Sequence, residues 1–314
     1  MKIRFLAASA VAVTGLIGAF TQGQATPVAL DASASSPGAA FSAYGGSTAY
    51  GGSNTAGGSN TAEASNAAAA HSAGGRGSTS VPDPTTTPTF SSNFSGSSLN
   101  TSIYGTCYPW FTDPAAGCQN FGNSGELEWY LPSQDQLSGG DLDLVAQPEA
   151  TAGENSSGDA ETYNCRSGMV TTYPGFNFEY GIVQVVADIP QTYGLWSGIW
   201  LLPTSEGWPP EIDMEETWGP PDVQTASTFH PVDYDTVQWS EASALSSGWH
   251  TFTLDWTPTS LTWWIDSTEV LTTSSDIPSQ SMYLVLTLAD YAQTSTQGCN
   301  GTMEIKSVKI WEQS

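Results

Sequence analysis

Apolar and polar residues alternate with a period of two along several short stretches of the chain. The clearest are GIVQVVADI (181–189), WHTFTLDWT (249–257), LTWWIDS (261–267), MYLVLTLA (282–289) and MEIKSVKIW (303–311). They are rich in β-branched and aromatic residues and are bounded by turn residues, which predicts strands. The short connections TPTS and DSTE predict hairpins. No stretch shows convincing apolar spacing of 3.6 residues, so we expect an all-β sandwich or barrel.

The N-terminal part of the chain has a different composition. Residues 26–88 are mostly Gly, Ser, Ala and Thr, with a degenerate six-residue repeat at 43–60 and the Pro/Thr-rich stretch VPDPTTTP at 81–88. Such a segment cannot bury enough apolar surface to offset the entropy of folding, which predicts a disordered linker. An adhesive role of the repeats is the alternative. All tryptophans and cysteines lie after residue 100, so residues 89–314 are predicted to form one domain.

Residues 1–25 predict a secretory signal peptide. Lys2 and Arg4 precede an apolar stretch that ends at Phe20, and a small-residue cleavage site follows at 23–25. The apolar stretch is short and is interrupted by Ser and Gly, which disfavours a membrane anchor. We therefore expect a secreted, extracellular protein.

In an oxidising compartment the four cysteines are expected to form two disulfides. Cys107, Cys118, Cys165 and Cys299 allow three pairings, and the sequence alone does not choose among them. Our guess pairs Cys107 with Cys118 across a short loop and leaves Cys165 for Cys299. No cysteine pair has zinc-like spacing and the three histidines lie far apart, so no metal site is predicted.

Net charge narrows the range of partners. The chain carries 31 acidic and 6 basic residues, for a formal net charge of −25. Nucleic-acid binding needs a basic surface, and a strongly acidic protein is repelled by anionic membranes and polyanionic substrates. We expect a monomer with neither nucleic acid nor membrane as a partner.

The segment PPEIDMEETWG at 209–219 concentrates four carboxylates within six residues. On a strand, Glu211 and Asp213 share one face, whereas Ile212 and Met214 point to the core. The residues alone allow three interpretations: a solvated strand face, a calcium site, or a pair of catalytic carboxylates.

Three tryptophans, Trp196, Trp200 and Trp208, come directly before this segment. Indole faces stack well on the apolar faces of sugar rings, so their proximity favours a glycan-binding site with catalytic carboxylates. Trp196 and Trp208 are the preferred sugar platforms, and Trp200 is expected in the core.

Several motifs occur in one order along residues 89–314. They are FSSNFSGSSLNTSIY, ELEWY, FNFEYGIVQVVADIP, GLWSGIWLLP…WPPEIDMEETWG, TFHP and GWHTFTLDWTPTSLTWWID. In these motifs the chain resembles glycoside hydrolase family 16, the family of laminarinases and lichenases. The resemblance implies a β-jelly-roll sandwich of two antiparallel sheets with a concave substrate cleft. It also implies retaining hydrolysis of β-glycosidic bonds by two carboxylates.

By this resemblance Glu211 matches the nucleophile and Asp213 the carboxylate that assists it electrostatically. The family places the acid/base at either of two spacings, which Glu215 and Glu216 satisfy respectively. In a regular strand Glu216 would enter the sandwich, where an unpaired carboxylate is strongly unfavourable. One β-bulge after Met214 would instead bring Glu216 to the cleft and leave Glu215 at the extra position. Glu216 is therefore the predicted acid/base, with Glu215 as the alternative.

The resemblance also suggests substrate contacts. His230 in TFHP matches a family histidine beside the acid/base, and Glu126 and Tyr130 in ELEWY are expected to line the cleft. Gln184 begins the stretch where many members have an Arg, which removes any sugar contact made by that Arg. Lys306 stands where a family Asp often helps to hold structural calcium, so the sequence does not favour calcium, and no cofactor is expected.

The leading hypothesis is a secreted, endo-acting, retaining β-glycosidase of β-1,3- or mixed β-1,3-1,4-glucan. A transglycosylase of the same fold is one alternative. A non-catalytic glycan-binding protein is another, and such a protein would be expected to lack one of the carboxylates.

Overall fold

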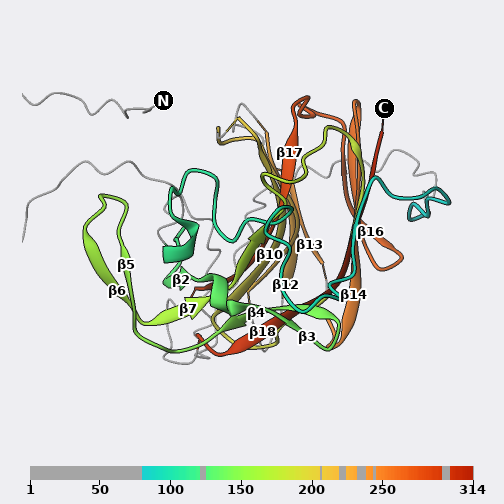
Figure 1. Cartoon of the computed structure of the whole chain (residues 1–314). Coiled ribbons are helices and arrows are strands. Elements are labelled where there is room, and N and C mark those ends of the chain that lie inside the picture. The colour runs from blue at the N-terminus through green and yellow to red at the C-terminus, as the bar shows by residue number, and fades with distance from the viewer. Residues whose placement is uncertain are drawn as a thin grey trace, which may run out of the picture. The chain divides into compact units, whose positions relative to one another are not determined.

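A computed structural model (Figure 1) describes residues 80–120, 125–205, 207–218, 224–231, 238–242, 245–291 and 298–313. The predicted signal peptide and most of the predicted linker lie outside these residues. None of the helices in the described ranges has the length and apolar character that crossing a membrane requires.

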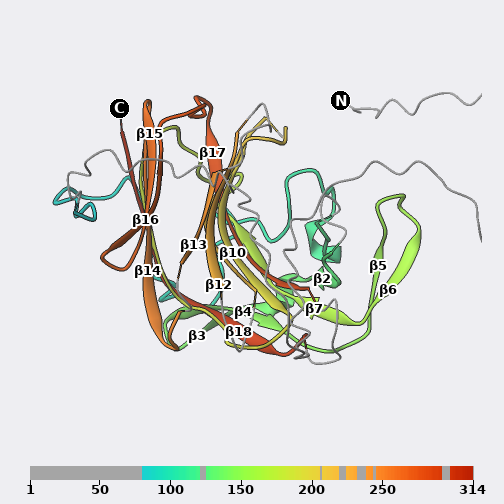
Figure 2. The same ribbon diagram turned by 180° about the vertical axis from the view of Figure 1, so that it is seen from behind.

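Two antiparallel sheets form the domain. The larger sheet contains β1 (Phe90–Ser92), β3 (Asp135–Ser138), β4 (Asp141–Ala146), β9 (Gly181–Asp188), β14 (Trp249–Thr257), β15 (Ser260–Ile265), β16 (Thr268–Thr273) and β18 (Gly301–Glu312). The smaller sheet contains β8 (Met169–Thr171), β10 (Leu195–Pro203), β11 (Glu211–Trp218), β12 (Gln224–His230), β13 (Gln238–Ala242) and β17 (Met282–Asp290). Figures 1 and 2 show the two sheets packed face to face, which confirms the predicted sandwich.

The sheet orders place the acidic strand near the middle of the smaller sheet. The eight-stranded sheet has the order β16-β15-β14-β9-β18-β4-β3, with β1 paired to β18, and the six-stranded sheet has the order β13-β12-β11-β10-β17-β8. All five stretches predicted as strands are strands, and TPTS and DSTE connect β14 to β15 and β15 to β16. The alternating pattern therefore located the central strands correctly.

The remaining elements are short. They are the 3-10 helices η1 (Pro114–Ala116) and η2 (Pro132–Gln134), the parallel pair β2 (Glu128–Tyr130) and β7 (Cys165–Ser167), and the hairpin β5 (Thr151–Glu154) to β6 (Ala160–Tyr163). The β5–β6 hairpin stands apart from the two sheets in Figure 1.

Side chains from both sheets fill the core between them. Ile212 and Met214 of β11 join this core, as predicted, together with residues of the eight-stranded sheet such as Phe252 and Leu254. Residues that alternate with core residues must therefore point to the opposite face of the six-stranded sheet.

A second hydrophobic cluster covers part of that opposite face. It consists of Cys107, Tyr108, Cys118, Tyr130, Met169, Leu202, Tyr283 and Val285. Leu202 follows the core residue Leu201 on β10, and Tyr283 lies between two core residues on β17, which places the cluster on the side away from the eight-stranded sheet.

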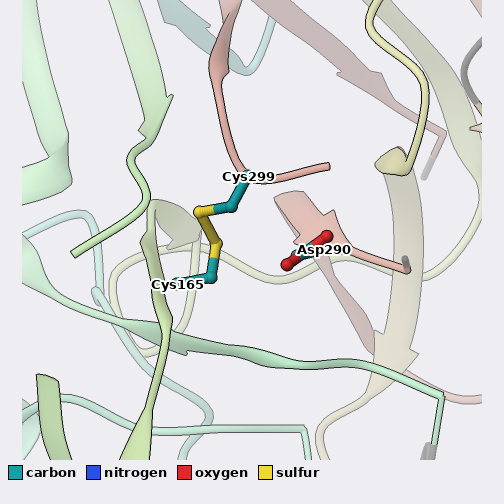
Figure 3. Close-up of side chains that lie close together, drawn as sticks. All are labelled: Cys165, Asp290 and Cys299. Carbon is teal, nitrogen blue, oxygen red and sulfur yellow. A yellow bond between two sulfur atoms is a disulfide. The ribbon is translucent and has the colours of Figure 1, made fainter. Parts of the chain in front are cut away.

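Both guessed disulfides are present, Cys107–Cys118 and Cys165–Cys299. Figure 3 shows the second bridge with the Asp290 carboxylate beside it. Cysteine binds metals as a thiolate, and these two sulfurs are bonded to each other, so this trio does not suit a metal ion.

The C-terminal strand contacts the end of the predicted linker. The indole Nε1 of Trp311 donates a hydrogen bond to the Thr86 carbonyl at 2.8 Å, and the Glu312 amide donates to Thr89 Oγ1 at 3.2 Å. Contact with the domain therefore begins at least three residues before the boundary predicted at Thr89.

Candidate active site

A β-bulge interrupts strand β11 in the middle of the acidic segment. The register against β10 shifts between Ile199 and Trp200, which leaves Met214 without a partner there. On the other side, the pairing with β12 passes from Asp213 directly to Glu216. An extra residue in a strand reverses the alternation of side chains beyond it. The predicted bulge is thus confirmed, but Met214 is the unpaired residue against β10, whereas the prediction gave that position to Glu215.

The bulge brings three carboxylates to one side of the sheet, which we call the carboxylate face and define by Glu211, Asp213 and Glu216. Thr228 pairs with Asp213 across the strands, and its Oγ1 donates a hydrogen bond to Glu216 Oε2 at 2.8 Å. Thr217 is buried on the other side. The predicted nucleophile and acid/base therefore lie on the same face.

Two side chains donate hydrogen bonds to backbone carbonyls at the bulge. The buried Trp263 of β15 donates from Nε1 to the Asp213 carbonyl at 3.0 Å. Ser227 of β12 donates from Oγ to the Met214 carbonyl at 3.0 Å. Buried carbonyls without partners are unfavourable, so these bonds stabilise the bulge and with it the orientation of Glu216.

Glu215 points into the sandwich. It pairs with the core residue Ile199, its side chain is 0% exposed, and Ser197 Oγ donates to its Oε1 at 2.9 Å. Burial raises the pKa of Glu215 to about 7, although hydrogen bonds from Thr217 and Ser197 lower it in part. Glu216 is thus outside the core, as predicted, and Glu215 is the carboxyl buried there, which the sequence did not predict.

The three carboxylates on the carboxylate face perturb one another. Burial raises the pKa of Glu211 to about 8; the neighbouring Glu216 charge also raises it, and a hydrogen bond from Trp208 lowers it. Burial also raises the pKa of Glu216 to about 7, opposed by the bond from Thr228. Burial and the charges of Glu211 and Glu216 hold the pKa of Asp213 well above its usual range. The cluster therefore keeps protons to higher pH than isolated carboxyls.

His230 lies beside the predicted nucleophile. Its Nε2 is 3.6 Å from Glu211 Oε1 and 3.7 Å from Asp213 Oδ2, whereas the resemblance had placed it beside the acid/base. Burial lowers the pKa of His230 to about 4, so the ring is neutral through most of the acidic range. The side chains of Glu211, Asp213 and His230 are close enough together to bind a cation. Such a cation would coordinate the carboxylate of the predicted nucleophile.

The three tryptophans before β11 differ in exposure. Trp208 is 44% exposed, and its ring lies 5.8 Å from that of His230. Trp196 is half-buried and makes an edge contact with Tyr291. Trp200 is also half-buried; it packs on the second hydrophobic cluster, and its Nε1 donates to Thr287 Oγ1 at 3.1 Å. Trp200 thus packs against a hydrophobic core, as expected, but this core is the second cluster and the ring is only partly buried.

Burial limits the predicted contacts from ELEWY. Tyr130 is 0% exposed within the second cluster, so its ring offers no surface for a sugar, and that expectation is wrong. Glu126 is almost fully buried, and its carboxylate accepts a hydrogen bond from Asn120 Nδ2 at 3.2 Å. Burial and the neighbouring Glu128 raise its pKa well above the usual range.

One aromatic residue near this face was missed. Trp110 is 42% exposed and stacks on Tyr108, with ring centroids 4.5 Å apart and planes inclined by 8°. The available signal was a tryptophan between two cysteines eleven residues apart, CYPWFTDPAAGC. Alternation could not reveal it, because the segment is not a strand.

The family model of the glycosyl hydrolases family 16 matches residues 141–308. Over 242 residues, the chain is 33% identical to the endo-1,3-1,4-beta-glycanase EglC of Rhizobium meliloti, covering 70% of this chain and 50% of that protein. It is 31% identical over 182 residues to the endo-1,3-1,4-beta-glycanase ExsH of the same organism, covering 53% and 38% of the two chains. The match thus spans no more than half the length of either relative.

A solved structure has the same fold. The laminarinase catalytic domain from Thermotoga maritima superposes with a TM-score of 0.60 at 22% identity, over 72% of this chain and 98% of that one. This likeness confirms the β-jelly-roll architecture expected from the resemblance. The family model covers more than half of the chain, including the bulged strand with its carboxylates. The chain therefore belongs to glycosyl hydrolase family 16.

Proposed function

We propose that the protein is a secreted endo-β-glucanase that cleaves β-1,3- or mixed β-1,3-1,4-glucan with retention of anomeric configuration. The observation that carries this proposal is the bulge, which sets Glu216 on the same face as Glu211 and buries Glu215. The printed activities of the two Rhizobium relatives support the choice of glucan.

In the first step Glu211 attacks the anomeric carbon, and a covalent bond forms from its carboxylate oxygen to that carbon. The bond from the anomeric carbon to the glycosidic oxygen breaks, and Glu216 gives its proton to that oxygen. In the second step Glu216, now ionised, takes a proton from water. The resulting hydroxide attacks the same carbon and releases Glu211 with its charge restored.

The partners of the two carboxylates suit these different roles. An indole N–H can only donate, so the hydrogen bond from Trp208 stabilises the ionised form of Glu211 and offsets part of the burial that raises its pKa to about 8. A hydroxyl both donates and accepts, so Thr228 accommodates Glu216 with or without its proton. The neutral His230 leaves the charge of Glu211 available for attack.

Raised pKa values also suit the acid. A general acid works best when its pKa lies near the working pH, and burial moves Glu216 in that direction. Trp208, which is exposed and lies beside the nucleophile, is the better of the two predicted sugar platforms, because Trp196 is half-buried and contacts Tyr291.

Incubation of the purified protein with laminarin, lichenan, agarose and xyloglucan tests this function. We expect a rapid fall in the viscosity of lichenan or release of oligosaccharides from laminarin, with the β-anomer first in the proton NMR spectrum. Glu211→Gln is the inactive control. First appearance of the α-anomer would refute retention, and no cleavage of either glucan would refute the activity. Longer products from an added acceptor would identify a transglycosylase. Binding of the protein to glucan without cleavage would identify a glycan-binding protein.

A further inference from the structure

The loop closed by the Cys107–Cys118 disulfide lies on the same face of the six-stranded sheet as the carboxylates. Both cysteines and Tyr108 belong to the second hydrophobic cluster, which covers part of that face. The Tyr108 ring also makes an edge contact with Trp200, at 6.1 Å between centroids. Trp200 pairs across the strands with Asp213 of the carboxylate cluster. The loop is therefore continuous with the candidate active site.

Several bonds hold this loop in one conformation. Cys118 and Tyr130 exchange both backbone hydrogen bonds, at 3.0 and 2.8 Å, and the Trp129 indole donates to the Ala116 carbonyl at 3.0 Å. Tyr108 itself is buried, so the ring on which Trp110 stacks is fixed. A rigid support lowers the entropy lost when a ligand binds to the side chain that it carries.

Trp110 is stacked on one side and partly exposed. Tyr108 lies flat against it, at an angle of 8°, and 42% of the Trp110 surface is exposed, as expected when only one side of an indole is covered. A large exposed aromatic ring on a rigid loop beside a catalytic site is a surface that a flat apolar ligand can cover. The apolar face of a pyranose ring has that shape.

We propose that Trp110 is a stacking platform for a glucosyl residue of the bound chain outside the site of cleavage, and so makes the enzyme prefer longer glucans. This inference rests on the proposed function, because it assumes that a glucan chain crosses the carboxylate face. On this proposal, a short oligosaccharide bound at Glu211 and Glu216 leaves Trp110 uncovered, whereas a longer one covers it.

The prediction is a dependence of activity on chain length. In the wild type, kcat/KM should rise with the length of reduced laminari-oligosaccharides until the platform is occupied. Trp110→Ala should lower kcat/KM on the longest oligosaccharides roughly tenfold, the factor expected for losing one stacked ring, and leave the shortest unchanged. Trp110→Phe should retain part of the gain.

Trp249→Ala is the matched control. Trp249 is 39% exposed, but it begins β14 in the other sheet and carries the Lys306 ammonium 5.0 Å above its ring. Its removal should leave the length dependence as in the wild type. Melting temperatures of all variants separate a loss of binding from a loss of fold.

Binding measured by calorimetry in Glu216→Gln protein distinguishes failure of this inference from failure of the proposed function. Weaker binding of laminarihexaose on Trp110→Ala, with laminaribiose unaffected, supports the platform even if no glucan is cleaved. Equal binding of the hexaose with and without Trp110 would overturn the platform and leave the proposed function intact. An equal loss at every length would also overturn it, because it would indicate a structural role of the loop.

Discussion

Replacing Glu215 by glutamine should make the stability of the domain less dependent on pH. Glu215 is fully buried, and burial raises its pKa from 4.5 to about 7. The folded state therefore holds a proton that the unfolded state releases at lower pH. This contribution to stability is complete below pH 4.5, is lost as the pH rises to about 7, and changes no further above it. The difference between the two pKa values corresponds to about 3 kcal/mol in the free energy of unfolding.

Glutamine keeps the shape of the protonated carboxyl but does not ionise. The Glu215→Gln variant should have nearly the wild-type free energy of unfolding at pH 4 and about 3 kcal/mol more than the wild type at pH 8. For a domain of this size that difference raises the melting temperature by about 6–12 °C at pH 8. Unfolding followed by circular dichroism from pH 4 to pH 8 measures both quantities. Glu161→Gln, at an exposed position on β6, is the control.

The reasoning fails if wild type and Glu215→Gln differ in stability by the same amount at pH 4 and pH 8. The activity of the variant is a second test. At pH 5 the variant should retain most of its glucan hydrolysis, because Glu215 does not reach the carboxylate face. A loss as complete as that of Glu216→Gln would contradict the bulge.

Three further predictions follow from contacts of the site and of the domain boundary. Trp263→Phe removes the indole N–H that donates to the Asp213 carbonyl at the bulge. The variant should lose about 1–3 kcal/mol of stability and have a lower kcat. An unchanged kcat in a folded variant would contradict the role of that bond. Thr228→Val removes the hydroxyl that lowers the pKa of Glu216, so the alkaline limb of the kcat/KM profile should move to higher pH, and a move to lower pH would refute this. A chain that begins at Val81 should melt at a higher temperature than one that begins at Phe90, because only the longer chain keeps two hydrogen bonds to β18 of about 1 kcal/mol each; equal melting temperatures would exclude this.

The alternation of apolar and polar residues predicted the central strands of the fold and the bulge in the candidate active site. Strands β9, β14, β15 and β18 each have a face turned to the core between the sheets, so the period of two survives in the sequence. The bulge was predictable for the same reason, since a regular strand would have buried Glu216.

The same period could not show what covers the other face. All nine residues of β17 are buried, because the second hydrophobic cluster covers the side turned away from the core. Trp200 contacts Tyr108, and Tyr130 pairs with Cys118, and both of these partners are distant in sequence. The burial of Tyr130 and Trp200 therefore depends on tertiary packing, and the pattern alone could not place them in this cluster.

The assignment of Glu211 as nucleophile and Glu216 as acid/base is tested most directly by azide rescue. The substrate is an aryl β-laminaribioside whose leaving group needs no protonation. With Glu216→Ala, azide should intercept the glycosyl-enzyme and give the β-glycosyl azide, because azide needs no base. With Glu211→Ala, azide should attack from the vacated side and give the α-anomer. Release of the β-azide by Glu215→Ala, with none from Glu216→Ala, would contradict the assignment.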